Sequence, residues 1–391
     1  ATNLTSAANP VAASADAGIG TVAGMNVLNS QSVNGGANMT STVVAPFQVS
    51  VADATTLTGS DVVSSTLSVS ANSGKSTVTG NSASNGVDLS ATNVSVSSAL
   101  ANVQYEGDIL TSTISSFSGA NATIGGDISL SSVAVDGNTM VGTTTGNTAN
   151  NSVAVDGAAK IAAGDTTSGA TANLATAYVA TADHALANQQ YVVSTLSTGV
   201  TATYNVVTLD AGTSLGGTIS GSTLSVSNNV QSAKTLGNVA GNSVDLTGGS
   251  ITTDSALASL QASTATAVGA TSTMTVAAPA SMATSTLALD GNANTATATV
   301  NTATNAMTVA ADNGLTTTKL PATVDNASLS GTVAGYVATG DFVVNNAQSV
   351  SNAAVVTATA TTSISNNDGG VLATGGIGQS SVSMSGNTTN A

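Results

Sequence analysis

The chain contains no cysteine and no tryptophan, and its only cationic side chains are four lysines and one histidine among 391 residues. Charged residues make up 6% of the chain, where about 25% is ordinary, and aromatic residues make up 2%. Disulfide bonds are excluded because they require cysteine pairs. The length alone would suit two or three ordinary domains.

The formal net charge of −15 excludes two classes of partner. Binding to nucleic acid needs clustered basic side chains and aromatic faces for stacking, whereas the four lysines are scattered along the chain. The same sign of charge disfavours binding to an anionic membrane surface.

Two long segments, 17–52 and 255–289, carry no charge. Both are rich in Ser, Thr, Asn and Gly, and each contains a proline, Pro46 and Pro279. A membrane-spanning helix needs about 20 mainly apolar residues, and neither segment supplies them. We therefore expect no insertion into a membrane.

Hydrophobic residues nevertheless make up 41% of the chain, and Val, Thr and Ile are abundant among them. Disordered chains usually lack such β-branched residues, which favour pleated, half-buried strands. Short alternating segments such as LSV, VDL and VAV are separated by Asn, Asp, Gly and Ser. The sequence thus predicts an all-β fold. Residues 171–190 have some helical character but read equally well as two strands around a turn.

Internal similarity is the strongest signal in the sequence. Residues 65–104 and 222–261 align without a gap and share STLSVS, VDL and SALA in one register. A Gly-Asn pair marks most units, at Gly80–Asn81, Gly146–Asn147, Gly237–Asn238, with Val300–Asn301 in the fourth place and Gly386–Asn387 in a fifth. A glutamine forms a second marker, at Gln31, Gln104, Gln190, Gln261 and Gln348.

The glutamine spacings alternate between shorter and longer values around about 79 residues, so the true period is a pair of units. These markers predict an N-terminal extended, strand-donating segment followed by repeat units. The boundaries are 1–30 for the N-terminal segment, 31–103, 104–189, 190–260 and 261–347 for four units, and 348–391 for a partial fifth.

Two all-β architectures are compatible with tandem units of this kind. In a β-solenoid, successive rungs stack and each contacts only its neighbours. In the alternative, the chain is a string of β-sandwich modules. Small side chains favour the solenoid, because its thin core has room for Val, Ala and Thr, and because Asn and Thr at equivalent positions can stack as ladders. Uneven spacing between the strands favours the modules.

Candidate catalytic residues are scarce. His184 follows Asp183, but a catalytic triad would also need a serine in the right place, and we interpret His184 as a surface residue in a turn. With one histidine and no cysteine a zinc site has almost no ligands. The sequence therefore predicts no enzyme, no catalytic residue and no cofactor.

Calcium is the one metal that deserves a test, because turns rich in aspartate can offer carboxylates. Asp136, Asp156 and Asp290 would be ligands only if they converge, and hairpin turns are the alternative. Alternating threonines at 295–300 and 356–362 could form a flat array of the kind that binds ice, although the two stretches do not share one position in the units.

The repeated GN…NSV and VDL pattern resembles secreted bacterial β-strand-repeat proteins, a loose class of adhesins and extracellular filament proteins. The resemblance implies an extracellular, cell-surface location and a structural or adhesive role without catalytic residues. Ala1 at the first position is consistent with a mature chain after removal of a signal peptide. The expected function is a filament or matrix subunit, and the alternative is the stalk of an adhesin.

The expected partner is a second copy of the chain, with a surface polysaccharide or an abiotic surface as further partners of this class. The partial fifth unit ends at Ala391, shortly after its Gly-Asn pair at Gly386–Asn387 and where its next strand should begin, which leaves an exposed strand edge. We expect residues 1–14 of a neighbouring subunit to fill that position and so build a head-to-tail filament.

Overall fold

The computed structural model is built from strands, and no helix occurs in the residues that it describes. The all-β prediction is confirmed. The described residues are 3–5, 11–14, 20–36, 38–44, 47–51, 61–162, 170–174, 178–208, 218–278, 282–316, 322–326, 336–351, 354–365 and 377–391.

The largest sheet, called the long sheet here, joins strands from almost the whole chain in parallel. Its order is β1 (Asn3–Thr5), β9 (Ser73–Ser95), β14 (Thr139–Ala162), β21 (Val230–Thr252), β26 (Ala293–Ala311) and β34 (Thr388–Asn390), with β27 (Leu315–Thr316) also paired to β21.

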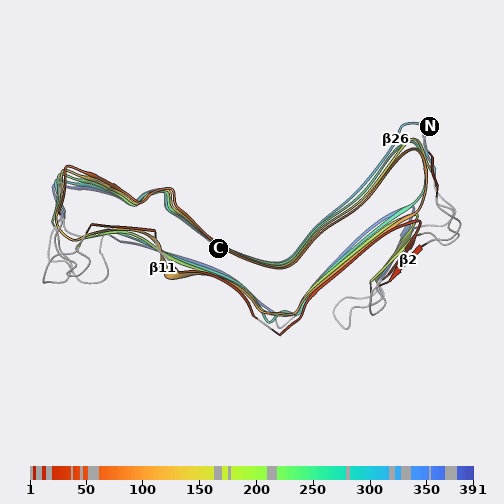
Figure 1. Cartoon of the computed structure of the whole chain (residues 1–391), viewed down its shortest axis with the longest axis horizontal. Helices are drawn as coiled ribbons and strands as arrows, with labels where there is room; N and C mark the ends of the chain where they lie inside the picture. The colour runs from red at the N-terminus through yellow and green to blue at the C-terminus, as the bar shows by residue number, and fades with distance from the viewer. Residues whose placement is uncertain are drawn as a thin grey trace.

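Two further parallel sheets lie opposite the long sheet. The middle sheet contains β4 (Met25–Val33), β10 (Ser98–Glu106), β17 (His184–Val192), β22 (Ser255–Ser263) and β30 (Phe342–Val350). The far sheet contains β5 (Met39–Val43), β6 (Phe47–Val51), β11 (Leu110–Ile124), β18 (Leu196–Thr208), β23 (Ala267–Ala277) and β31 (Val355–Ser365). Figure 1 shows the resulting thin, bent outline of two facing layers.

Two short parallel sheets complete the return to the long sheet. One contains β7 (Val62–Val63), β12 (Ile128–Ser129), β19 (Ile219–Ser220), β24 (Met282–Ala283) and β32 (Ile377–Gly378). The other contains β8 (Thr66–Ser68), β13 (Ser132–Ala134), β20 (Thr223–Ser225), β25 (Thr286–Ala288) and β33 (Ser381–Ser383).

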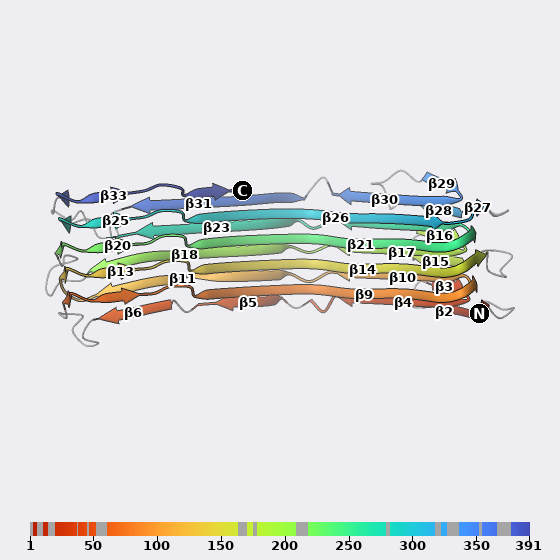
Figure 2. The ribbon, with the colours of Figure 1, turned by 90° about the horizontal axis from the view of Figure 1, so that it is seen from above.

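The chain visits these sheets in the same order each time, and we call each passage a circuit. The five circuits span 3–68, 73–134, 139–225, 230–288 and 293–383. Figure 2 shows them side by side in sequence order, from the first at one end to the fifth at the other. We call the outer surface of the first circuit the N-side face and that of the fifth the C-side face.

Corners with positive φ separate the short sheets from the long sheet. Gly137 and Gly291 adopt φ of 66° next to Asp136 and Asp290, at corners between parallel sheets and not in the hairpin turns that the sequence offered for these aspartates. Gly386 has φ of 65° and follows Ser385, whose carbonyl accepts a hydrogen bond from the backbone N–H of Gly291 at the equivalent corner. Gly386–Asn387 therefore belongs to this corner and is not equivalent to Val300–Asn301, so the fifth Gly-Asn assignment is wrong.

The Asp156–Gly157 pair is not a turn. Strand β14 continues through it to Ala162, and the register with both neighbouring strands shifts by one residue between Gly157 and Lys160. The pair thus precedes a β-bulge, in which one strand carries an extra residue.

A sixth sheet, the side sheet, is antiparallel and covers the outer surface of the middle sheet. Its strands are β2 (Val11–Ser14), β3 (Gly20–Ala23), β15 (Ala170–Leu174), β16 (Tyr178–Ala182), β28 (Ala322–Asn326) and β29 (Tyr336–Gly340). The middle sheet is thereby buried on both faces, and alanines such as Ala99, Ala185 and Ala256 allow the two sheets to pack closely. The described part of residues 171–190 accordingly belongs to strands β15, β16 and β17 and not to a helix.

The N-terminal segment, predicted to donate a strand to a neighbour, is paired within its own chain. Asn3 of β1 is opposite Asn93 of β9, and β2 forms a hairpin with β3. The segment therefore completes the first circuit here.

The two similar segments of the sequence hold matching columns of the long sheet. Val87 and Val244 both pair with Val153, and Leu89 and Leu246 both pair with Val155. All six side chains are buried in one hydrophobic cluster between the long and middle sheets. A second cluster, centred on Tyr204, fills the space near the far sheet.

Candidate assembly surfaces

The five marker glutamines form one column across the middle sheet. Each pairs in register with the next, and the Nε2 of every glutamine after Gln31 donates a hydrogen bond to Oε1 of the preceding glutamine over 2.8 to 3.0 Å. Nε2 also donates across the core, for example from Gln104 to the carbonyl of Thr148 on the long sheet. Gln104, Gln190 and Gln261 are fully buried, so the ladder satisfies amides that would otherwise be costly to enclose.

Asparagines form parallel ladders with the opposite polarity. In the Gly-Asn column, Nδ2 of Asn81, Asn147 and Asn238 donates to the asparagine of the following circuit over 2.8 Å. Four residues further along, Asn85, Asn151 and Asn242 do the same. The asparagine positions chosen from sequence are therefore connected by hydrogen bonds between circuits, which hold the register of adjacent strands.

The glycine of the Gly-Asn pair has a steric purpose. A Cβ on Gly237 would lie 2.3 Å from the carbonyl oxygen of Val300 in the next circuit, and one on Gly146 would lie 2.8 Å from that of Gly237. Val300 occupies the same column in β26, where the described residues place no strand on its other side. A side chain is thus accommodated only in the last circuit.

The C-side and N-side faces expose the polar and apolar groups that are paired in the interior. On the C-side face, Val344, Val350 and Val356 are exposed by 46%, 42% and 46%, whereas equivalent residues in earlier circuits, such as Leu257, are buried. On the N-side face, Met25 is 45% exposed while its column neighbour Ser98 is fully buried. Both faces are cross-sections through the core.

The glutamine ladder ends differently on the two faces. Gln348 uses its Nε2 to bond Gln261, which leaves its Oε1 as the last acceptor on the C-side face in the described part of the chain. Gln31 accepts from Gln104 and uses Nε2 to bond the carbonyl of Ser82, and an amide has a second hydrogen to donate. The C-side face therefore offers an acceptor in the column where the N-side face offers a donor.

His184 is fully buried, contrary to the predicted surface position. Its Nδ1 lies 2.9 Å from the hydroxyl of Ser98 in the adjacent strand, and burial lowers the pKa of the imidazole to about 4. Its Nε2 is buried without a hydrogen-bond partner among the described residues. On β17 His184 lies on the same face as Leu186, which packs in the cluster between the long and middle sheets, so its burial depends on the facing sheet and no local sequence pattern indicates it.

Aspartates next to His184 form a column at one corner. The backbone N–H of Asp183 donates to Oδ1 of Asp254 over 2.5 Å, and Thr253 donates to the Asp183 carboxylate over 3.0 Å. Burial, together with the adjacent Asp254 charge, raises the pKa of Asp183 to about 6. At neutral pH the two adjacent carboxylates, Asp183 and Asp254, therefore reduce the stability of the folded chain.

Glu106, the only glutamate, is fully buried in a column whose neighbours are Val33 and Val192. Its Oε2 has no hydrogen-bond partner in the described residues, and a Cβ on Gly80 would collide with it. Nearby Asp108 accepts from the backbone N–H groups of Gly35 and Gly36. Sequence reasoning missed this residue, although a single charged residue at a valine position was the available signal.

The proposed calcium ligands do not converge. Asp136 accepts from Ser225 and from the N–H of Ser227, and Asp290 accepts from Ser383 and Ser385, so each fastens a corner to the following circuit. The hydrogen bonds from Ser385 and Ser383 lower the pKa of Asp290. Asp156 lies elsewhere, on β14. Within the described ranges no three His, Asp or Glu side chains gather to hold a metal.

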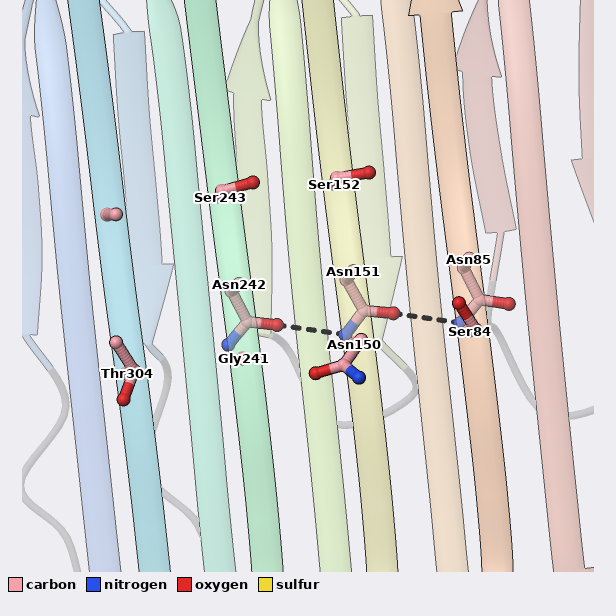
Figure 3. Close-up of a pocket in the computed structure, with 10 residues that line it drawn as sticks. Ser84, Asn85, Asn150, Asn151, Ser152, Gly241, Asn242, Ser243 and Thr304 are labelled. Carbon is pink, nitrogen blue, oxygen red and sulfur yellow. Dashed lines mark hydrogen bonds between the residues drawn. The ribbon is translucent and has the colours of Figure 1, made fainter.

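A shallow groove of about 320 Å³ lies on the outer surface of the long sheet. Equivalent residues of four successive strands line it, without a charged or aromatic side chain: Ser84, Asn85, Asn150, Asn151, Ser152, Gly241, Asn242, Ser243, Thr304 and Ala306. Figure 3 shows the bonded amides of Asn85, Asn151 and Asn242 side by side across these strands. The groove could hydrogen-bond an uncharged polyhydroxyl ligand.

The two alternating threonine stretches lie on different sheets, at 295–300 in β26 and at 356–362 in β31. On the far sheet, however, threonines align across circuits: Thr42 with Thr113, and Thr271 with Thr359. Gly199 interrupts this column between Thr113 and Thr271. The described residues thus present hydroxyl groups in rows but not as an unbroken array.

No family model matches the chain, and no curated protein or solved structure matches it either. The described residues also contain no helix long and apolar enough to cross a membrane.

Proposed function

We propose that the chain is a β-solenoid rod that serves as a structural subunit of an extracellular bacterial filament or matrix. Each parallel sheet takes strands from the whole length of the chain, whereas separate sandwich modules would keep their strands within one module. The alternating 73, 86, 71 and 87-residue steps between bonded glutamines support tandem units.

Subunits join end to end by pairing of edge strands. The observation that carries this proposal is the match between the C-side and N-side faces, where β30 to β33 and β4 to β8 leave parallel edges in corresponding sheets. Exposed edges of this kind recruit further strands. Such a contact is heterologous and does not close on itself, so it builds a filament.

The glutamine column gives a sharp test of this joint. Gln348→Leu removes the acceptor on the C-side face and one internal hydrogen bond, whereas Gln190→Leu removes an amide from the fully buried part of the same ladder. We expect Gln348→Leu to reduce filament length in negative-stain images with little change in Tm. Gln190→Leu should lower Tm but leave assembly of the folded fraction unchanged.

Fibre diffraction supplies the second measurement. Filaments joined in register should give a repeat of about 4.8 Å along the filament axis, because strands lie across that axis. Absence of filaments, with short single rods at all concentrations, would contradict the proposal and favour the stalk of an adhesin. The uncharged outer groove supports that second candidate, because a stalk of this kind could bind a surface polysaccharide.

A further inference from the structure

In the described residues, the side sheet contains one strand more than the middle sheet that it covers. It has six strands, contributed as three hairpins by the first, third and fifth circuits, while the middle sheet has five. Adjacent strands lie about 4.8 Å apart, so a hairpin of two strands is as wide as two circuits. Only every second circuit can therefore carry a hairpin. This explains why longer spacings of 91 and 95 residues alternate with shorter ones of 66 and 63 between bonded corner asparagines.

The side strands are offset by half a step from the circuits. Strand β3 packs against both β4 and β10, β16 packs against both β17 and β22, and β28 packs against both β22 and β30. The outermost strands flank the ends: β2 packs against β4, and β29 packs against β30. In Figure 2 these two strands lie at opposite margins of the stack.

The offset has a consequence for the end-to-end joint proposed above. If β30 of one copy pairs with β4 of a second copy, β29 and the second copy's β2 claim the same position beside the joint. Two copies bring twelve side strands to ten middle strands, which provide nine intervals and two ends, or eleven positions. One side strand is left without a place.

We infer that each end face fits a circuit without a hairpin, and that two intact copies join only when the outer strand of an end hairpin, β2 or β29, leaves the side sheet. The inference rests on the proposed function and identifies the partner surface more closely. The end hairpins, β2–β3 and β28–β29, thus restrain growth of the filament, whereas the central hairpin, β15–β16, has no part in the joint.

The register defines three matched deletions that turn a hairpin-bearing circuit into a hairpin-free one. In the fourth circuit, two residues, Thr253 and Asp254, link β21 to β22. Removing residues 6–22, 163–181 or 317–339 leaves the same two-residue link before β4, β17 or β30. Each deletion uncovers an equivalent surface of the middle sheet, so non-specific adhesion should affect all three equally.

The experiment compares the full chain with these three variants by sedimentation velocity and negative-stain imaging, after circular dichroism has shown that each is folded. We expect the 6–22 and 317–339 deletions to lower the concentration for half-maximal assembly by about tenfold or more. The 163–181 deletion should assemble like the full chain. Equal assembly of all four proteins would overturn the inference alone, and failure of all four to form filaments would overturn the proposed function as well.

Hydrogen exchange on the intact chain tests the same point without a deletion. On assembly, amides of either β2 or β29 should exchange faster than in the free protein, because one of these strands has been displaced. Amides of β15 and β16 should be unchanged. Greater protection of both β2 and β29 in the filament would show that both hairpins fit at the joint, and would overturn the inference.

Discussion

The carboxyl Oε1 of Glu106 accepts a hydrogen bond of 2.9 Å from the backbone N–H of Asp108, and among the described residues this is the one hydrogen bond of the carboxyl group, in a column otherwise occupied by valine and serine. Burial raises the pKa of Glu106 to about 7, the bond from Asp108 lowers it in part, and the Asp108 charge raises it further. The folded chain therefore binds more protons than the unfolded chain between pH 4.5 and 7.

This linkage predicts that Glu106 costs stability at neutral pH. Protonation of Glu106 contributes fully to the free energy of unfolding below pH 4.5, and this contribution is lost progressively as the pH rises to about 7. Glu106→Val should therefore raise the free energy of unfolding at pH 8, by about 1–4 kcal/mol, and have a smaller effect at pH 4. Thermal unfolding at both pH values measures the difference, with exposed Asp88→Asn as the control. A gain of equal size at both pH values would contradict the prediction.

His184 predicts a pH dependence of opposite sign. Burial lowers the pKa of its imidazole to about 4 from 6.5, so the unfolded chain binds more protons in that range and stability is lost as the pH falls from 6.5 towards 4. His184→Ser places the residue of the neighbouring strands at this column, Ser98 and Ser255. We expect the variant to have lower Tm at pH 7 because of the lost volume, but a flatter Tm profile between pH 6.5 and 4. An unchanged slope would refute the argument.

The Gly-Asn column predicts a steric effect that depends on position. Gly237→Ala would place a Cβ 2.3 Å from the backbone oxygen of Val300, and we expect a loss of about 1–3 kcal/mol because backbone must move. Gly199 has no atom within 4 Å of the corresponding Cβ, so Gly199→Ala should be neutral or stabilising by about 0.4–1 kcal/mol. Urea unfolding of the two variants checks the contrast. Equal effects would mean that the strands are not as close as the structure has them.

The sequence predicted which residues occupy equivalent positions in successive circuits better than it predicted what packs against those positions. The marker glutamines are recognisable because an amide ladder demands the same side chain in every circuit, and the alternating strand pattern reports a periodic backbone. The alternation of long and short units was visible, but its cause was not, because the fit of a hairpin to two circuits is a tertiary relation between β15–β16 and strands of other circuits. The corner at Gly386 was misassigned because Gly-Asn satisfies two different local requirements.

Burial of single polar residues was the least predictable feature. Ser98 and His184 bond each other between adjacent strands of the middle sheet, on the face that also carries Leu100 and Leu186 and packs against the long sheet, and this pairing is a relation between circuits. Glu106 sits in the core because its neighbours in the column are apolar, which is a relation between circuits and not a property of the local pattern YEGD. Such residues were accordingly interpreted as surface groups or overlooked.

The open edge of β9 predicts where trypsin cleaves the folded chain first. Both Lys75 and Lys234 are exposed on strands, not in turns, but Lys234 lies on β21 between β14 and β26, whereas Lys75 lies on β9. Within the described residues β9 pairs on its outer side only with β1, opposite Asn93 to Ser95. A protease must detach a strand before it can cleave it, and detachment costs less at an edge. Limited proteolysis with mass spectrometry should therefore show cleavage after Lys75 well before cleavage after Lys234.

In filaments, a neighbouring copy at the N-side face should slow cleavage at Lys75 and leave the rate at Lys234 unchanged. Equal rates at the two lysines in the free chain would contradict an open edge at β9, and with it the surface on which end-to-end growth depends.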